Sequence, residues 1–507
     1  MRRNAVAAVA VLAILAAAGF AAYGAPVFEG RTSTASLSQC DPIPGGTHSS
    51  TQLASTTFGA VTEWALPSQG RIPNGVIAAP DGSVWFAEQE LPGVAHLFPD
   101  NGTLVEYAWP GFPTPKPPDC LDQSQSSGIA IWNGMVWAAD MYANNGAGTI
   151  IGVDPATGST EAVNLTAKAP YPYWLAVGPH DNLWYTSDNI TQYPAQLGRV
   201  SPNLTVSAVN LLGVSRYDEP IQVDFVNSSL AFIAALNQAT TSNGSCICTG
   251  HIYAFDPSIN STDVPVTRVG GNYTLVLPDS VSFSDGRVWV AQHGASSVVS
   301  YDFATGQWTR YPTSLVPWSY TTLPYVIYSA GTEVWFNEHY ANRIAELHQA
   351  SGTLTEYSES DPPASGAGGI QNDVSMAPGT GGMWFTSLSG NYVGFVNASF
   401  VPAFSISPPA NDTLYLSPGG TASVDLSVTG SWSTPLGVNV SDTENPDSIP
   451  VRITVSPSVP TIPSGTSYEL KVQITAAASL PAGDYTVAVT VTDGGVQQSA
   501  FVFLVVT

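Results

Sequence analysis

Positive charge is what this sequence has least of. The 507 residues include 14 Lys and Arg against 38 Asp and Glu, which gives a formal net charge of -24, and only 10% of all residues are charged. Binding to nucleic acid depends on a basic surface that meets the phosphates. The composition therefore argues against nucleic acid as a partner. With so few charges, we expect solubility to rest on Ser, Thr and Asn, and on attached sugar.

Several common catalytic motifs are also absent. The sequence contains no Gly-rich phosphate loop, no HExxH helix and no GxSxG elbow. These motifs are the usual signs of nucleotide binding, zinc proteolysis and serine hydrolysis. None of these three activities is therefore indicated by a motif.

A repeated unit of about 50 residues organises most of the chain. Residues 74–107, NGVIAAPDGSVWFAEQELPGVAHLFPDNGTLVEY, contain four short apolar runs separated by Gly turns. Later copies repeat this pattern around an aromatic anchor, and the anchors are Trp85, Trp137, Trp184, Phe232, Trp289, Trp335 and Trp384. Four strand-like segments per unit at this period are typical of β-propeller blades. The sequence predicts an all-β fold with seven blades over residues 58–400.

The last copy lacks its final strand, and the missing strand is found before the first copy. The seventh unit stops after Val396, whereas residues 58–66, FGAVTEWAL, match the closing strand of the other units. A strand from one end that completes the blade at the other end leaves no unpaired edge in the ring. We therefore expect residues 58–66 to close the propeller.

The N-terminal segment indicates export. Arg2 and Arg3 precede the uncharged run AVAAVAVLAILAAAGFAAYGA, which predicts a secretory signal over residues 1–25. An uncleaved membrane anchor is the alternative, because the run nearly reaches the roughly 20 residues that span a bilayer. Either reading places the remainder outside the cell, secreted or at its surface, with residues 26–57 as a Ser/Thr/Pro-rich spacer.

Sequons for N-linked sugar agree with export. Most lie in predicted turns, where glycosylation requires them. We expect a glycoprotein modified at Asn101, Asn164, Asn189, Asn203, Asn227, Asn243, Asn260, Asn272, Asn397, Asn411 and Asn439.

The four cysteines predict disulfide bonds in an exported chain. They are Cys40, Cys120, Cys246 and Cys248, which allow three pairings, and we expect Cys40 and Cys120 to fasten the spacer to a connection between blades. The alternative is a metal site formed by the last two cysteines with His251. That set matches a structural zinc site poorly, because such sites use four ligands and wider cysteine spacing.

The pattern changes after the propeller. Residues 401–507 contain short strands of period two separated by Gly, Pro and Asp turns, which is typical of an immunoglobulin-like β-sandwich. The segment PAGDYTVAVTVTDGG resembles modules appended to microbial surface proteins, which implies adhesion or spacing. Self-association through this domain is one such role.

Candidate site residues are sought where propellers place their chemistry, at the mouth of the central channel. Polar residues there start the innermost strands or follow the aromatic anchors. The candidates for ligand binding are Asn74, Glu88, Asp140, Tyr173, Asp279 and Tyr325.

The blades resemble those of a known family. The units PDGSVWFAE, TEVWFNEHYANRI with GTLTEY, and GGMWFTS are similar to blades of the streptogramin B lyase family, also called virginiamycin B lyase, over residues 58–396. The resemblance implies a seven-bladed propeller and a magnesium-dependent lyase that opens a cyclic depsipeptide by elimination. It also implies a site of histidines and glutamates, with histidines at the start of innermost strands.

This chain departs from that family at the implied site. The matching positions hold Asn74, Asp279 and Tyr325, and the last blade reads WFTSLSG without the late glutamate. A relocated site is the alternative. His293, Glu338 and His339 follow the anchors of two adjacent blades, and could act as catalytic groups, with Glu338 and His339 as ligands of Mg²⁺.

Two functions remain, and the fold alone does not decide between them. The first is a binding or structural protein that presents the propeller face to a cell-surface protein, a glycan or a small molecule. The second is a metal-dependent lyase or hydrolase at the relocated site. The missing family histidines favour the first function.

Overall fold

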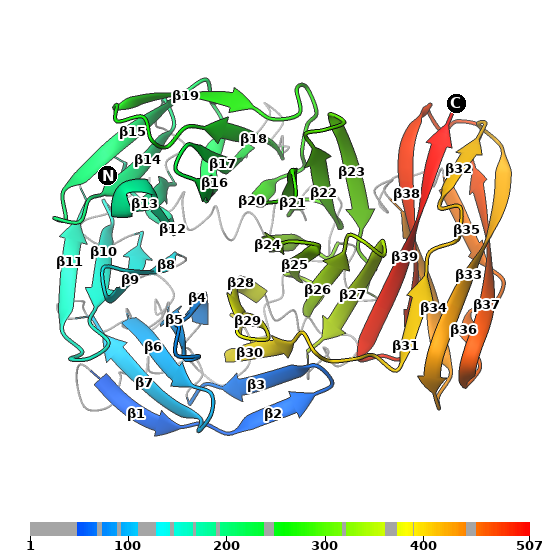
Figure 1. Ribbon diagram of the computed structural model, residues 1–507, viewed down its shortest axis with the longest axis horizontal. Coiled ribbons are helices and arrows are strands. Elements are labelled where there is room, and N and C mark those ends of the chain that lie inside the picture. The colour runs from blue at the N-terminus through cyan, green and yellow to red at the C-terminus, as the bar shows by residue number, and fades with distance from the viewer. Residues whose placement is uncertain are drawn as a thin grey trace, which may run out of the picture.

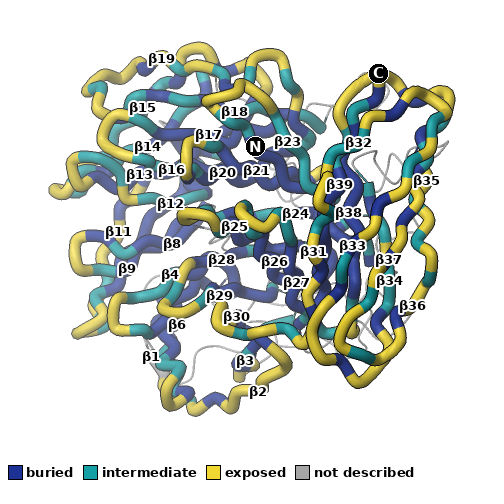
Figure 2. The backbone as a smooth tube through the Cα atoms, turned by 45° about the vertical axis from the view of Figure 1, so that its right-hand side comes forward, coloured by how far each residue is buried: buried dark blue, intermediate teal, exposed yellow. Residues whose placement is uncertain are grey.

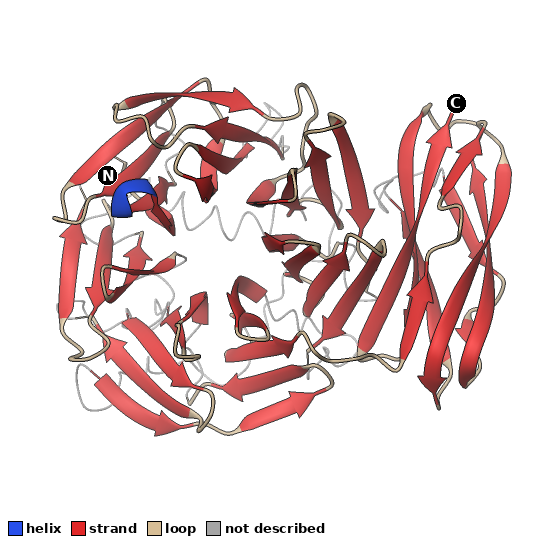
Figure 3. Ribbon diagram, viewed as in Figure 1, coloured by secondary structure: helices blue, strands red, loops and turns tan. Residues whose placement is uncertain are grey.

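The computed structural model describes residues 48–67, 73–88, 93–109, 128–141, 147–165, 169–188, 193–237, 248–316, 321–359, 373–388, 390–442 and 453–507. These residues form strands and turns, with a single 3-10 turn at Pro179–Asp181 as their helical element (Figure 3). No helix among them is both long and apolar enough to cross a membrane. The predicted signal or anchor, residues 1–25, lies outside the described residues. The all-β prediction is confirmed.

Seven antiparallel meanders of four strands surround a common centre in Figure 1, and we call them blades 1 to 7 in chain order. Each of the first six runs from an innermost to an outer strand. Blade 1 contains β4 (Pro73–Ala78), β5 (Val84–Glu88), β6 (Gly93–Phe98) and β7 (Thr103–Ala108). Blade 2 contains β8 (Ile129–Trp132), β9 (Met135–Asp140), β10 (Thr149–Val153) and β11 (Thr160–Asn164).

The next four blades repeat this order. Blade 3 contains β12 (Pro172–Gly178), β13 (Asn182–Ser187), β14 (Gln196–Val200) and β15 (Val206–Leu212). Blade 4 contains β16 (Glu219–Asn227), β17 (Leu230–Asn237), β18 (Thr249–Phe255) and β19 (Asp263–Arg268). Blade 5 contains β20 (Pro278–Ser284), β21 (Arg287–Gln292), β22 (Ser297–Asp302) and β23 (Gln307–Pro312). Blade 6 contains β24 (Pro324–Ala330), β25 (Glu333–Glu338), β26 (Arg343–His348) and β27 (Thr353–Ser358).

Blade 7 takes one strand from the N-terminal part of the chain. It contains β28 (Asp373–Gly379), β29 (Gly382–Ser387) and β30 (Tyr392–Asn397), and β3 (Val61–Ala65) pairs antiparallel with β30. Two further N-terminal strands extend the outer edges, because β2 (Ser55–Phe58) pairs with β3 and β1 (His48–Gln52) pairs with β7. Residues far apart in the chain thus close the ring (Figure 1).

One pairing between blades was not predicted from the repeat. The outer strand of blade 3, β15, pairs in parallel with the outer strand of blade 4, β19, so the two blades form one sheet of eight strands. The amide N–H of Asn210 also donates to the carbonyl of Thr262 at 2.7 Å. Blades 3 and 4 are therefore joined at their outer edges.

The aromatic anchors are buried between the blades. Trp85, Trp137, Trp184 and Trp289 are among the largest fully buried side chains. The rings fit because some facing strand positions hold glycine. A Cβ atom on Gly152 would lie 2.8 Å from the ring of Trp137, and one on Gly178 would lie 2.5 Å from the ring of Trp184. Figure 2 shows the inner strands buried and the hairpin turns exposed.

The C-terminal part forms two facing sheets. One contains β31 (Phe404–Ser407), β33 (Thr421–Trp432), β37 (Gly465–Ala476) and β35 (Ile453–Pro457). The other contains β32 (Thr413–Leu416), β39 (Val496–Val506), β38 (Gly483–Thr492), β34 (Leu436–Asp442) and β36 (Thr461–Ile462). A single apolar cluster fills the space between them, as expected for a β-sandwich.

The sandwich is continuous with the propeller. Strand β39 pairs antiparallel with β27, the outer strand of blade 6, from Thr353 opposite Ala500 to Tyr357 opposite Val496. Backbone hydrogen bonds across this pair fix the sandwich to one blade, as Figure 1 shows. The pairing also covers the outer edge of blade 6.

Candidate functional site

The channel mouth is the end of the central channel where the innermost strands begin, and we define it by Tyr173, Asp279, His293, Tyr325 and His339. Asp279 and Tyr325 are the second residues of β20 and β24, and Tyr173 is the second residue of β12 on the other side of the ring. His293 and His339 each follow the last residue of a second strand, β21 and β25. Three blades thus supply these side chains.

A backbone device that recurs in blades 3, 5 and 6 positions this site. The residue before the proline at the start of the innermost strand has a positive φ, which is 58° at Tyr171, 45° at Leu277 and 50° at Leu323. Positive φ is uncommon and strained for residues with a side chain, and it clusters at functional sites.

The carbonyl of each such residue accepts a hydrogen bond from the end of the adjacent strand. The donors are the backbone N–H groups of Asp188, His293 and His339, at 2.9, 2.9 and 3.0 Å. The same local geometry therefore presents one polar side chain to the mouth from each of the three blades. The repeated Pro followed by Tyr or Asp is the sequence signal for this device, and Asp188 was missed as a candidate.

Asp279 and His293 form a buried pair. Nδ1 of His293 lies 2.9 Å from Oδ2 of Asp279, and their side chains are only 7% and 4% exposed. Oδ2 of Asp279 makes no hydrogen bond within the described residues, so the contact is electrostatic. A carboxylate beside one imidazole nitrogen favours a proton on that nitrogen. The other nitrogen, Nε2, is buried and has no hydrogen-bond partner among the described residues.

Three rings pack at the centre of the mouth. The ring of Tyr325 lies 5.1 Å from that of His293 and 5.4 Å from that of His339, and the two imidazoles are 5.4 Å apart. The hydroxyl of Tyr325 is hydrogen-bonded to the hydroxyl of Tyr173, which comes from the opposite side of the channel. Nδ1 of His339 is buried and has no hydrogen-bond partner within the described residues.

Burial sets the protonation of two of these groups. Burial, and then the neighbouring His293, lower the pKa of His339 well below its ordinary value, so this imidazole is neutral at physiological pH. Burial, and then Tyr173 and Asp279, raise the pKa of Tyr325 well above its ordinary value. The mouth therefore combines a neutral imidazole, a carboxylate-oriented imidazole and a phenol that keeps its proton, which is a set suited to general acid–base chemistry.

Glu338 belongs to a different cluster. Its carboxylate lies 3.8 Å from Nη1 of Arg343, and burial, followed by the charge of Glu356, raises its pKa well above the ordinary value. Consecutive strand residues point to opposite faces, so Glu338 and His339 do not share a site. The predicted metal pair of Glu338 and His339 is not brought together.

The remaining predicted ligand-binding residues lie within the fold. Asn74 is buried, and its carbonyl accepts a hydrogen bond from the hydroxyl of Thr386 at 2.7 Å. Glu88 and Asp140 are buried at the ends of β5 and β9, where both have partners in the protein. All three are therefore engaged within the blades, and their role in ligand binding stays a prediction.

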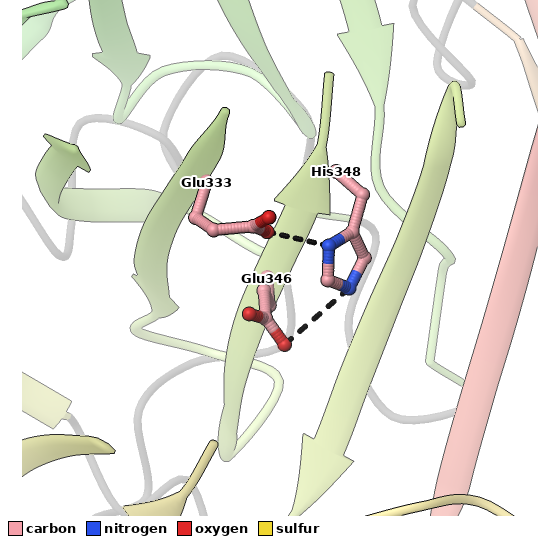
Figure 4. A group of neighbouring side chains, drawn as sticks. All are labelled: Glu333, Glu346 and His348. Carbon is pink, nitrogen blue, oxygen red and sulfur yellow. Dashed lines mark ion pairs between the residues drawn. The ribbon is translucent and has the colours of Figure 1, made fainter. Parts of the chain in front are cut away.

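A metal-compatible group lies elsewhere in blade 6 (Figure 4). Ligand atoms of Glu333, Glu346 and His348 lie within 4.8 Å of one another. His348 places Nδ1 2.5 Å from Glu333 and Nε2 3.5 Å from Glu346, so its ring bridges the two carboxylates. Burial, and then the charge of Glu333, raise the pKa of Glu346 to about 7. Figure 4 shows both carboxylates on the same side of the imidazole, one facing each ring nitrogen.

The mouth does not fit Mg²⁺. This ion prefers six oxygen ligands in near-octahedral geometry, whereas the mouth offers two imidazoles, the carboxylate of Asp279, which lies against His293, and the carboxylate of Asp188, which interacts with Glu219. Within the described residues, the group of three side chains whose ligand atoms could hold a metal ion is Glu333, Glu346 and His348 in blade 6. The chemistry of the mouth is therefore derived from its own side chains.

Cys248 is the one cysteine within the described residues, and it is not a free thiol. The other three cysteines, its partner among them, lie outside that part, so the pairing stays a prediction. Of the eleven predicted glycosylation sites, Asn189 and Asn243 lie outside the described residues. The nine others are exposed.

The chain is similar to several solved structures. This chain is similar to a structure of streptogramin B lyase, at 18% identity over 66% of this chain and 97% of that chain, with a TM-score of 0.45. It is similar to virginiamycin B lyase from Staphylococcus aureus, at 18% identity over 66% and 98%, with a TM-score of 0.47. A catalytically inactive form of that enzyme with quinupristin gives 16% identity over 66% and 98%, with a TM-score of 0.48.

Such identities and TM-scores carry no information about activity. No protein-family model matches the chain, and no curated protein matches it. Its function has to be argued from the channel mouth.

Proposed function

We propose that this chain is an exported, glycosylated seven-bladed β-propeller with an immunoglobulin-like C-terminal sandwich, and that its channel mouth is an acid–base active site. The observation that carries the catalytic proposal is the pair of Asp279 and His293, at 2.9 Å, with Nε2 of His293 left without a partner among the described residues. A buried nitrogen without a hydrogen bond is costly unless a ligand meets it. The exposed sequons and the apolar N-terminal run support export.

The reaction that fits this set is elimination from an ester. Nε2 of His293 accepts a proton from the carbon beside a carbonyl, the electrons of the broken C–H bond form a C=C bond, and the C–O bond of the ester breaks to release a carboxylate. The phenol of Tyr325, which keeps its proton, donates a hydrogen bond to the carbonyl oxygen where negative charge develops. No water is consumed, and atoms and electrons balance.

Neutral His339 completes the mouth as a second hydrogen-bonding group. Because its pKa is lowered well below the ordinary range by burial, it meets a substrate without a positive charge. It therefore serves to orient a polar group of the ligand. The runner-up function is binding without turnover at the same mouth, which the unpartnered nitrogens would support equally.

Quinupristin is the probe that separates these functions, because a neighbouring fold was solved with it. The exported protein is incubated with quinupristin, with and without EDTA, and the products are separated and weighed by mass spectrometry. Elimination gives a ring-opened product of unchanged mass, and hydrolysis adds the mass of one water. We expect the first product, insensitive to EDTA.

Two variants test the assignment. His293→Gln should abolish conversion, whereas His348→Gln, a change of the same kind on the outside of blade 6, should leave it unchanged. Saturable binding without a product would favour the binding role. Conversion that persists in His293→Gln would contradict the site.

A further inference from the structure

The central channel contains a cavity beyond the mouth, which we call the lower channel cavity. It has a volume of about 410 Å³ and is lined by the innermost strands β4, β8, β12, β16, β24 and β28. Its lining residues follow the strand starts that form the mouth, so it lies further along the same channel. Exposed Val177 and Pro378 are part of its wall, so the cavity opens to solvent at the end opposite the mouth.

Two features separate the cavity from the mouth. The hydroxyls of Tyr173 and Tyr325 meet across the channel. Trp174, the next residue of β12, lines the cavity. It packs against one apolar cluster that belongs to blades 3 and 4 and against another that belongs to blades 6 and 7. A ligand of the lower cavity therefore does not need the acid–base groups of the mouth.

The polar groups of the cavity are nearly all used within the protein. The side-chain oxygen of Gln222 accepts a hydrogen bond from the N–H of Val281 at 2.7 Å, and the hydroxyl of Ser375 accepts one from the N–H of Val76 at 3.1 Å. One oxygen of Asp224 accepts a hydrogen bond from the N–H of Phe283 at 3.1 Å. Each of these bonds joins one blade to the next.

Asp224 differs from Gln222 and Ser375 because its side chain is charged. Among the described residues, none donates a hydrogen bond to its second oxygen, and no Lys, Arg or His lines the cavity. Burial raises the pKa of Asp224 to about 6, partly offset by the hydrogen bond from Phe283, so the carboxylate is charged at neutral pH. The cavity thus holds a negative charge that the protein does not compensate.

The rest of the wall is apolar and aromatic. Trp174, Phe225 and Tyr328 line the cavity together with aliphatic side chains. A cation is attracted to an aromatic face, and quaternary ammonium groups are bound in this way. A volume of this size also lies in the usual range for small-molecule sites, roughly 300–1,000 Å³.

We propose that the lower channel cavity binds a small organic cation, an ammonium group on a compact apolar body, with Asp224 as counter-ion and the aromatic wall around the cation. The alternative is a solvent-filled channel in which Asp224 only joins blade 4 to blade 5. An asparagine at position 224 would keep that structural bond, because its amide oxygen can still accept from Phe283. The substitution Asp224→Asn therefore removes the charge while it keeps the hydrogen bond between blades 4 and 5.

The test uses choline and its neutral isostere 3,3-dimethylbutan-1-ol, titrated into the full exported chain by calorimetry at pH 7.5. We expect saturable binding of choline, with the isostere about tenfold weaker or more, because the isostere fills the same volume without the charge. Asp224→Asn should weaken choline binding by a similar factor. Glu161→Gln, which removes one exposed charge from β11, should leave it unchanged.

Three results would overturn the proposal. They are the absence of saturable choline binding to the wild-type chain, equal affinity for the isostere, and choline affinity that Asp224→Asn does not change. If Asp224→Asn fails to fold, the comparison of choline with its isostere on the wild-type chain still decides. Quinupristin conversion is measured on the same variants, and we expect Asp224→Asn to retain it.

Discussion

The hydroxyl of Tyr173 is hydrogen-bonded to that of Tyr325, although the two residues are 152 positions apart and belong to blades 3 and 6. This contact spans the channel and connects opposite sides of the ring. It holds Tyr325 between His293 and His339. The arrangement of the mouth therefore depends on a contact that does not run through neighbouring blades.

The tyrosine pair predicts coupled effects on stability. Removing either hydroxyl, by Tyr173→Phe or Tyr325→Phe, takes a partner from the other and should cost about 1 kcal/mol of unfolding free energy. Since the double variant removes both groups, we expect it to cost less than the sum of the single changes. Denaturant unfolding of the four forms measures this difference. Strictly additive costs would show that the two hydroxyls do not interact.

Arg343 predicts a large effect on the junction with the sandwich. It donates to the carbonyl of Ser314 at 2.9 Å and lies 3.5 Å from Glu356, while Ser314 is hydrogen-bonded at 3.0 Å to Gln497 of β39. Arg343→Met would leave the buried carboxylate of Glu356 without its cation, which costs about 3–5 kcal/mol. Unfolding in denaturant and faster proteolysis between propeller and sandwich should both report it.

Glu338→Gln is the matched comparison for that variant. Because burial and the charge of Glu356 raise the pKa of Glu338 well above its ordinary value, an uncharged amide is expected to replace this carboxyl with little change. We expect a loss of less than about 1 kcal/mol. A loss as large as that of Arg343→Met would mean that Glu338 is ionised and pairs with the arginine.

The raised pKa values of buried carboxyl groups predict that the protein is more stable in mild acid. Burial raises the pKa of Asp224 to about 6 and those of Glu346 and Glu359 to about 7. Between its ordinary and raised values, such a group binds more protons in the folded than in the unfolded state, so unfolding free energy falls as pH rises through this window.

Buried histidines have the opposite dependence. Burial lowers the pKa of His96 to about 4, and the stability from this neutral ring is lost as pH falls from about 6.5 toward that value. Carboxyls with raised pKa outnumber such histidines in the described part of the chain, so we expect a higher Tm at pH 5 than at pH 7.5. Glu359→Gln should reduce the difference. Calorimetry at the two pH values checks this, and a lower Tm at pH 5 would contradict it.

The period of the aromatic anchors was sufficient to predict an all-β propeller. Trp85 and its counterparts recur because each blade needs one large aromatic side chain in its core. The spacing of these residues along the chain is enough to identify the repeat. The pairings of β15 with β19 and of β27 with β39 were not predicted. They join outer strands whose apolar pattern is satisfied within their own blades, so nothing in the periodicity marks a further partner.

The candidate site was predicted in part. His293 and His339 follow equivalent anchors in adjacent blades, and the structure places their rings 5.4 Å apart. Glu338 was grouped with them because it is adjacent in sequence, but the alternation of a strand turns it toward Arg343. The contact of Tyr173 with Tyr325 crosses the ring, and spacing along the chain does not show which blades face each other.

The tautomer of His293 is the most direct test of the proposed site. In protein labelled with ¹⁵N-histidine, long-range ¹H–¹⁵N spectra distinguish the two ring nitrogens, and the spectrum of His293→Gln assigns the signal. We expect that Nδ1 carries the proton toward Asp279, that Nε2 is bare, and that Asp279→Ala abolishes this preference. A proton on Nε2 in the wild-type chain, or a signal that Asp279→Ala leaves unchanged, would contradict the assignment of His293 as the base.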